Sequence, residues 1–258
     1  MTPNPNPTTT SPAAPERADP SDTASLYRHL RVADVADALD GIGYFDLMLM
    51  DREVRPLWEG MKFWGPAATI RAVPANRPMW ILERTQDIVE AHRIWFEEVG
   101  YLGLPGDLPA GHVIVTSTGG APEVGFWGSD NAMGATGAGA VGIITDGYCR
   151  DTGEVVLQQN PVVARHRGRT IIPGRIHVVE VQTTVSCGGV QVRPGDIVGC
   201  DDDGVVVVPH EVADEVARHA RAILLADMAA RRKHYERLGR RLDGSVDIDA
   251  VEAYYQGL

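Results

Sequence analysis

The chain has 258 residues, of which 44% are hydrophobic, and it carries 24 basic against 35 acidic side chains. A chain of this length and composition can bury a substantial core. The acidic balance argues against a nucleic-acid partner, because binding phosphates requires clustered positive charge. Its three isolated cysteines, Cys149, Cys187 and Cys200, support neither a disulfide framework nor a Cys-x-x-Cys metal site, so a cytoplasmic location is expected.

The first residues contain no apolar segment of the kind found in a signal peptide. Residues 1–22, rich in Pro, Thr, Asn and Ala, are expected to form a disordered tail. Residues 23–258 are expected to form one domain that includes a C-terminal helical extension. No stretch reaches the roughly 18 apolar residues that a membrane span needs, so no membrane partner is expected.

Hydrophobic spacing predicts an α/β fold. Apolar residues at helical spacing predict three long helices, at about 21–41, at 79–99 and at about 211–241. A Gly- and Pro-rich stretch at 102–111 predicts a loop. Short β-branched runs predict strands at 65–73, 113–116, 141–145, 161–165, 176–185, 189–192 and 197–200.

Several familiar motifs are excluded by their context. Residues 137–142 match Gly-x-Gly-x-x-Gly, but they close a helix and precede a strand, whereas a dinucleotide site needs the opposite order. The Asp run at 201–203 lacks the ligand spacing of a calcium loop and predicts a solvated turn. The sequence contains no nucleophile elbow, no phosphate loop and no His-Glu-x-x-His zinc helix.

Two neighbouring charges, Arg150 and Asp151, follow the strand at 141–145 through an expected turn at Gly147. The planar fork of Arg matches a carboxylate, and Asp is a hard oxygen ligand of the kind that Mg²⁺ takes singly with water. The pair is therefore a candidate site for a small anionic substrate held with a metal. The alternative is an internal ion pair that caps the strand.

A glycine followed by Ser, Asp and Asn, at Gly128, Ser129, Asp130 and Asn131, predicts the beginning of a helix. A helix N-terminus presents free N–H groups and partial positive charge, which suits an anion. The alternative is an ordinary capped helix with no ligand.

Four motifs in this order resemble the RraA-like proteins, a family that includes the ribonuclease-E activity regulator and the 4-hydroxy-4-methyl-2-oxoglutarate aldolases. The resemblance covers residues 26–222. The motifs are Val-Ala-Asp-Ala-Leu-Asp at 35–40, Gly-Pro-Ala-Ala-Thr at 65–69, Asp-Gly-Tyr-Cys-Arg-Asp at 146–151, and Pro-Gly-Asp-Ile-Val at 194–198 running on to Asp-Gly-Val-Val-Val-Val-Pro at 203–209.

The resemblance implies a layered, swivelling-domain α/β sandwich, here with a long C-terminal helix, assembled as a homotrimer or hexamer with sites at subunit interfaces. It also implies that Arg150 grips a 2-oxo acid, that Asp151 binds Mg²⁺ or Mn²⁺, and that the loop Gly128–Asn131 receives the substrate carboxylate. Aldolase members carry an acid twenty-one positions before the Arg, where this chain has Ser129. Either Asp130 replaces that acid through a one-residue shift, or the acid is absent.

The resulting hypothesis is a divalent-metal-dependent carbon–carbon lyase, an aldolase or decarboxylase, with Arg150, Asp151 and Asp130 as catalytic residues. One alternative is a non-catalytic binding protein like the ribonuclease regulator. Another is a metal-enolate enzyme redirected to hydration, isomerisation or ring opening, which the insertion at 74–108 and the change at Ser129 both favour.

Overall fold

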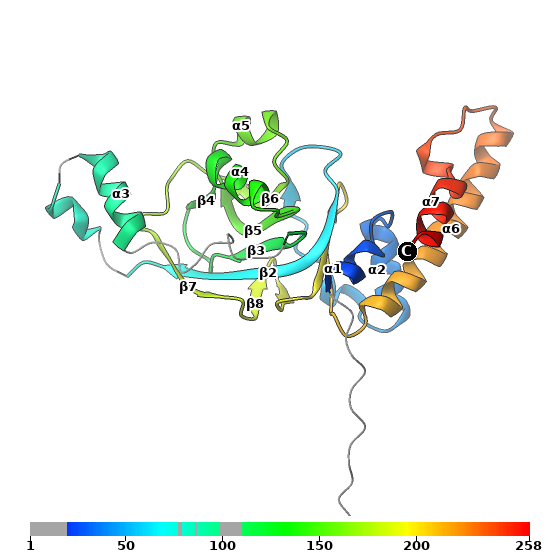
Figure 1. Ribbon diagram of the computed structural model, residues 1–258, viewed down its shortest axis with the longest axis horizontal. Helices are drawn as coiled ribbons and strands as arrows, with labels where there is room; N and C mark the ends of the chain where they lie inside the picture. Colours follow the sequence, from blue (N-terminus) through cyan, green and yellow to red (C-terminus); the bar gives the residue numbers. More distant parts are fainter. Residues whose placement is uncertain (1–19, 77–78, 86, 99–109) are drawn as a thin grey trace, which may run out of the picture.

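The structure is a computed structural model that describes residues 20–76, 79–85, 87–98 and 110–258 (Figure 1). The predicted α/β class with a long C-terminal helix is confirmed. The expected tail lies outside the described residues except for 20–22, which belong to the first helix. No helix in the described part of the chain combines the length and apolar composition needed to cross a bilayer.

The helices, in chain order, are α1 (Pro20–Ser25), α2 (Val32–Gly41), α3 (Ile88–Glu98), α4 (Ser129–Gly137), α5 (Thr152–Leu157), α6 (Ala213–Arg237) and α7 (Ile248–Gln256). Short 3₁₀ turns are η1 (Phe45–Met48), η2 (Trp80–Glu83) and η4 (Gly244–Val246). In Figure 1, α3 lies at the far end of the molecule from α6 and α7, and α4 and α5 cover one face of the sheet.

The strands are β1 (Arg55–Pro56), β2 (Phe63–Pro74), β3 (Val113–Ser117), β4 (Gly125–Trp127), β5 (Gly142–Cys149), β6 (Val162–Arg167), β7 (Ile176–Val181), β8 (Val185–Cys187), β9 (Val190–Val192), β10 (Ile197–Asp201) and β11 (Gly204–Val208). The main sheet has the order β1-β6-β5-β3-β2-β10-β11, with β4 paired to β5 and β7 paired to β2. Strands β2, β3, β5 and β6 run parallel, and β4 runs parallel to β5. The carboxyl ends of β4 and β5 therefore lie side by side.

Three apolar clusters hold these layers together. One packs α3, α4 and α5 against the sheet, and a second lies between the sheet and the β8–β9 hairpin. The third joins α2 and α6 to β11. The predicted apolar stripe of the C-terminal helix supplies buried residues to this cluster, which are Val216, Ala220, Leu224 and Met228.

The prediction of one helix over 21–41 is wrong, because two helices occupy this segment. Arg31 has an extended backbone, with φ −94° and ψ 156°. Its N–H donates to Oδ2 of Asp34 at 3.0 Å, which begins α2 as a new helix. Tyr27 and Leu30 in the connection are fully buried, so the break is set by tertiary packing.

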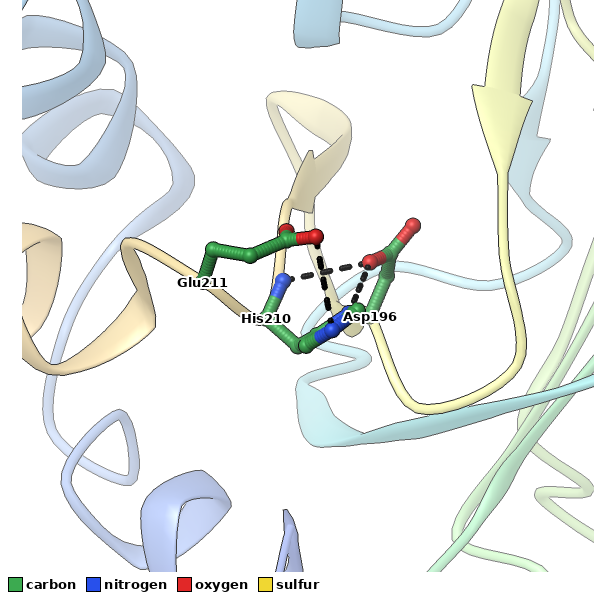
Figure 2. Close-up of side chains that lie close together, drawn as sticks. All are labelled: Asp196, His210 and Glu211. Atoms are coloured by element: carbon green, nitrogen blue, oxygen red, sulfur yellow. Dashed lines mark hydrogen bonds and ion pairs between the residues drawn. The ribbon is translucent and has the colours of Figure 1, made fainter. Parts of the chain in front are cut away.

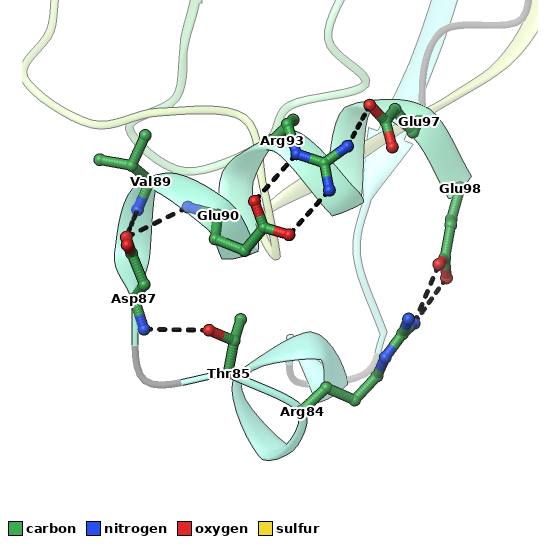
Figure 3. Close-up of polar contacts among 8 residues, drawn as sticks. All are labelled: Arg84, Thr85, Asp87, Val89, Glu90, Arg93, Glu97 and Glu98. Atoms are coloured by element: carbon green, nitrogen blue, oxygen red, sulfur yellow. Dashed lines mark hydrogen bonds and ion pairs between the residues drawn. The ribbon is translucent and has the colours of Figure 1, made fainter.

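The helix predicted over 79–99 is also interrupted. Only η2 and α3 are helical within the described residues, and α3 has its own N-terminal cap (Figure 3). Oδ1 of Asp87 accepts the N–H groups of Val89 and Glu90 at 2.9 and 3.2 Å. Residues 86 and 99, like most of the loop predicted at 102–111, lie outside the described residues.

Two predictions in the β regions need correction. The turn expected at Gly147 is absent, because β5 continues through Gly147 to Cys149 with a shift in register. The strand predicted over 176–185 ends at Val181, because Gln182 has a left-handed backbone (φ 53°). The N–H of Gln182 donates to the carbonyl of Thr69 at 2.8 Å, which turns the chain away from β7.

The C-terminal helix is shorter than predicted, since α6 begins at Ala213 and ends at Arg237. Strands β1, β4 and β11 and helix α7 were not predicted. A strand of two or three residues is too short to show alternation. The sequence offered no signal for β4 because its three residues are all buried.

We expect Tyr27→Phe to destabilise the fold. The hydroxyl of Tyr27, within a fully buried residue, donates to the carbonyl of Ala213 at 2.6 Å and so ties the N-terminal segment to the start of α6. Removing it deletes one buried hydrogen bond, which costs about 0.5–1.5 kcal/mol. Urea denaturation followed by circular dichroism measures this loss. The control is Tyr235→Phe, whose hydroxyl bonds Asp243 at the exposed surface; equal losses in the two variants would contradict the assignment.

Candidate functional site

Arg150 and Asp151 lie where the carboxyl ends of β4 and β5 meet. The N–H of Arg150 donates to the carbonyl of Trp127, the last residue of β4, at 2.9 Å. This bond continues the parallel pairing and places the first turn of α4 beside the charged pair. Ligand sites of open α/β sheets occur at this edge, outside the carboxyl ends of the strands.

Two glycines allow the close contact. A Cβ at Gly128 would lie 2.7 Å from Oδ2 of Asp151, and a Cβ at Gly125 would lie 2.9 Å from Cβ of Arg150. Real Cβ atoms do not approach so closely. The backbone between β4 and α4 can therefore lie directly against Arg150 and Asp151 only because both positions lack a side chain.

The two charges contact each other but stay accessible. Nε of Arg150 lies 3.4 Å from Oδ2 of Asp151, and the side chains are 34% and 41% exposed. Among the described residues, the Arg150 guanidinium makes no hydrogen bond, so its donors remain open to a ligand. Asp151 has a left-handed backbone, with φ 49° and ψ 37°, an unusual conformation that is found disproportionately at functional sites.

The start of α4 is partly committed to its own cap. The N–H of Gly128 donates to Oδ1 of Asn131 at 2.7 Å, and Nδ2 of Asn131 donates to the carbonyl of Phe126 at 2.8 Å. The expected role of the Gly128 amide as a carboxylate donor therefore conflicts with this cap. The N–H group of Asp130, in the first turn, has no partner within the helix and can serve that role.

A pocket of about 400 Å³ lies over this edge. Five of the six predicted site residues line it: Gly128, Asp130, Asn131, Arg150 and Asp151. Ser129, the sixth, is not among the lining residues. Their roles in binding and catalysis stay predictions.

The other half of the pocket lining was not predicted. It consists of Phe96 from α3, Gly125 and Phe126 from β4, and Ile171 and Ile172 from the connection before β7. Scattered apolar residues carry no local signal for a ligand site. The spacing of Gly125 and Gly128 around two aromatic residues was the available sequence signal for a ligand site at this position.

Cys149, directly before the charged pair, is not a nucleophile. It is fully buried, and this burial, together with the nearby Asp151 carboxylate, raises the pKa of the thiol to about 12. Because the thiolate is the reactive form, Cys149 is inert at neutral pH.

A second cluster, Asp196, His210 and Glu211, has three potential metal ligands close together (Figure 2). Nδ1 of His210 lies 3.1 Å from Oδ1 of Asp196, and Nε2 lies 3.4 Å from Oε1 of Glu211. The guanidinium of Arg193 bonds both carboxylates, at 3.1 Å from Asp196 and 2.7 Å from Glu211.

Arg193 therefore already occupies the position that a cation would take in this cluster. Its guanidinium lowers the pKa of Glu211 to about 2. Asp196, which is 2% exposed, also accepts the backbone N–H groups of Arg193 and His210. The cluster ties the turn before β10 to the start of α6, and we interpret it as structural.

Comparisons with known proteins agree with this architecture. Residues 32–207, more than half of the chain, match the RraA-like family model, described as Aldolase/RraA. A Halalkalibacterium halodurans protein named "Putative 4-hydroxy-4-methyl-2-oxoglutarate aldolase" is 26% identical over 213 residues, covering 82% of this chain and 88% of its own.

Protein DlpA of Legionella pneumophila is 27% identical over 195 residues, which are 76% of this chain but only 29% of DlpA. This chain therefore spans less than a third of that relative. The solved structure of Streptomyces coelicolor RraAS2, described as an unusual member of the RNase ES inhibitor RraA protein family, superposes with a TM-score of 0.65 at 25% identity. The match covers 84% of this chain and 98% of RraAS2.

The family match and the shared fold thus confirm what the four sequence motifs predicted: this chain belongs to the RraA-like family.

Proposed function

We propose that this protein is a divalent-metal-dependent carbon–carbon lyase, an aldolase or decarboxylase, that acts on a small 2-oxo acid. One observation carries the proposal: a single pocket combines an Arg150 guanidinium with open donors, the Asp151 carboxylate and the first turn of α4. The Halalkalibacterium relative, named as an aldolase and matched over most of both chains, supports it.

Asp151 fits the role of a metal ligand. Its carboxylate is 41% exposed and lines the pocket. Mg²⁺ and Mn²⁺ prefer oxygen ligands, and Mg²⁺ commonly takes one or two carboxylates while keeping several waters. When bound, the ion would supply Lewis-acid stabilisation of the negative charge that develops on the 2-oxo group.

Arg150 would hold the substrate carboxylate. Its guanidinium can donate two parallel hydrogen bonds to a carboxylate, and the N–H group of Asp130 can add a further donor at the positive end of α4. Together these groups would orient the 2-oxo acid so that its reacting bond points into the pocket.

Asp130 is the candidate for proton transfer. Its side chain is exposed and lines the pocket, whereas Ser129 does not line it. A general acid or base must reach the reacting group directly or through one water. Of the two open interpretations of the loop, this arrangement supports the one-residue shift that makes Asp130 the family acid.

The test is pyruvate release from 4-hydroxy-2-oxo acids and decarboxylation of oxaloacetate, with Mg²⁺ or Mn²⁺ and after treatment with EDTA. We expect turnover that depends on the added metal. If no 2-oxo acid is turned over with any metal, the proposal fails and the non-catalytic alternative is favoured. Gel filtration with light scattering would test the proposed trimer or hexamer.

Asp151→Asn should abolish metal binding and reduce turnover by at least about a hundredfold, while the fold persists. The substitution removes the charge at nearly constant volume, and Asn tolerates a left-handed backbone well. Calorimetric titration with Mn²⁺ measures the binding, and thermal melting checks the fold. Equal affinity in the wild type and the variant would exclude Asp151 as a ligand.

Arg150→Lys should weaken substrate binding by about tenfold or more, because a point charge cannot reproduce a two-pronged contact. Steady-state kinetics on an accepted 2-oxo acid would show this as a raised KM. The matched control is Arg71→Lys, which changes an exposed ion pair with Glu180 on β7. Unchanged kinetics in both variants would identify Arg150 as a purely structural ion-pair partner.

Asp130→Asn should lower kcat by about a hundredfold or more, within the range attributed to a positioned acid or base. Ser129→Ala should change kcat by less than about threefold, because its side chain does not line the pocket. Measuring kcat for both variants across pH separates the two positions. The opposite ranking would place the family acid at the position of Ser129.

A further inference from the structure

The pocket has two chemically different walls. Arg150, Asp151, Asp130 and Asn131 form the polar wall, after the end of β5 and in the first turn of α4. The lining also includes four apolar residues, here called the apolar wall: Phe96 and Ile171, which are half-buried, and Phe126 and Ile172, which are buried. This apolar wall takes no part in the function proposed above.

Phe96 is held in place by its helix. Its neighbour Trp95 is 5% exposed and packs in the core. The two rings meet edge to face, with centroids 5.2 Å apart, and Trp95 also contacts the ring of His177 on β7. The anchored Trp95 thus keeps α3 on the sheet and Phe96 at the pocket.

Ion pairs support α3 on its exposed side (Figure 3). Arg93 pairs with Glu90 and Glu97 along the helix. Arg84, from the preceding segment, pairs with Glu98 at 2.8 Å and ties the two ends of this region together. Exposed pairs contribute little individually, so the buried Trp95 is the main anchor and these pairs assist it.

Ile171 and Ile172 are held by the segment before β4. The N–H of Gly125 donates to the carbonyl of Thr170 at 3.2 Å. Arg169 donates through its backbone N–H and its guanidinium to Glu123, at 2.7 and 3.0 Å. These contacts lower the pKa of Glu123 to about 2, so the link is fully ionised at neutral pH.

The charges of the pocket match one carboxylate. Arg150 is the only basic side chain among the described residues that line it, and Asp130 and Asp151 are both acidic. A second carboxylate of a substrate would find no second basic side chain among these described lining residues. Placing an unpaired charge there is unfavourable, because the carboxylate loses water without gaining a partner.

We propose that the substrate is a 2-oxo monocarboxylic acid with an apolar or aromatic group at its far end, and that Phe96, Ile171 and Ile172 select this group. The inference rests on the proposed function and names its substrate class. For a 4-hydroxy-2-oxo acid, the C3–C4 bond breaks and the hydroxyl proton leaves. Its oxygen becomes the aldehyde carbonyl, the bonding pair passes to C3 as pyruvate enolate, and a proton then gives pyruvate.

The test separates binding from turnover. Calorimetry with Mg²⁺ present compares phenylpyruvate with 2-oxoglutarate, which differ in the group at the far end. We expect phenylpyruvate to bind the wild-type protein at least about tenfold more tightly, because it buries its ring on the apolar wall. Equal or tighter binding of 2-oxoglutarate overturns the inference.

Two variants localise the preference. Phe96→Ala should weaken phenylpyruvate binding by about fivefold to tenfold and leave 2-oxoglutarate unchanged, since it removes apolar contact area. Ile171→Arg should reverse the preference by supplying a second cation. The control, Val89→Ala, alters an apolar residue of α3 that is 75% exposed and does not line the pocket. Thermal melting identifies any variant that fails to fold.

The outcomes distinguish this inference from the lyase proposal. Selective phenylpyruvate binding that both pocket variants change supports the inference, even where no 2-oxo acid is turned over and the lyase proposal fails. Metal-dependent pyruvate release without that selectivity supports the lyase and overturns the inference. An unchanged preference in both folded pocket variants also overturns it.

With an active enzyme, 4-hydroxy-2-oxo-4-phenylbutanoate should exceed 4-hydroxy-4-methyl-2-oxoglutarate in kcat/KM by about tenfold or more.

Discussion

The candidate site depends on the parallel pairing of a three-residue strand, β4, with the end of β5. That pairing brings the turn before α4 against Arg150 and Asp151, and the absence of a Cβ at Gly125 and Gly128 makes the contact sterically possible. A larger residue at Gly128 would meet the Asp151 carboxylate directly. The geometry that leaves a cation and an anion accessible in one pocket is thus set by backbone contact.

The acidic residues of the family motifs divide into two roles. Oδ1 of Asp146, in the same motif as Asp151, accepts the N–H and hydroxyl of Thr118 and supports the end of β3. Asp196 bonds Arg193 and His210 and joins two segments distant in sequence. Both carboxylates are occupied by protein donors, whereas Asp151 has one ion contact and is open to the pocket. An acidic residue whose carboxylate already binds several protein donors is structural, whereas one with few protein partners is a candidate ligand. Its place in a motif does not make this distinction.

The part of the predicted 74–108 insertion that the structure describes adds an apolar residue to the pocket. It contributes α3, whose buried Trp95 docks the helix on the sheet and whose Phe96 faces the candidate site. Phe96 joins Phe126, Ile171 and Ile172 as the apolar residues of a lining that also contains the charged pair. Under the proposed function, the charged residues would receive the 2-oxo acid and α3 would contribute to the choice of the group at its other end.

The sequence by itself determined the α/β class and the long C-terminal helix, because both depend on local periodicity. It also determined the family and most of the charged residues of the candidate site, because these depend on residues adjacent in the chain, such as Arg150 and Asp151. Tertiary structure decided the rest. The break between α1 and α2 reflects the burial of Tyr27 and Leu30, and the continuation of β5 through Gly147 reflects pairing with neighbouring strands. The exact path of one turn leaves Ser129 out of the pocket lining and lets Asn131 accept the Gly128 amide. Contacts between residues far apart in the sequence bring Phe96, Ile171 and Ile172 to the same pocket. Side-chain type and spacing do not encode these contacts locally, because they exist only once packing has brought the segments together.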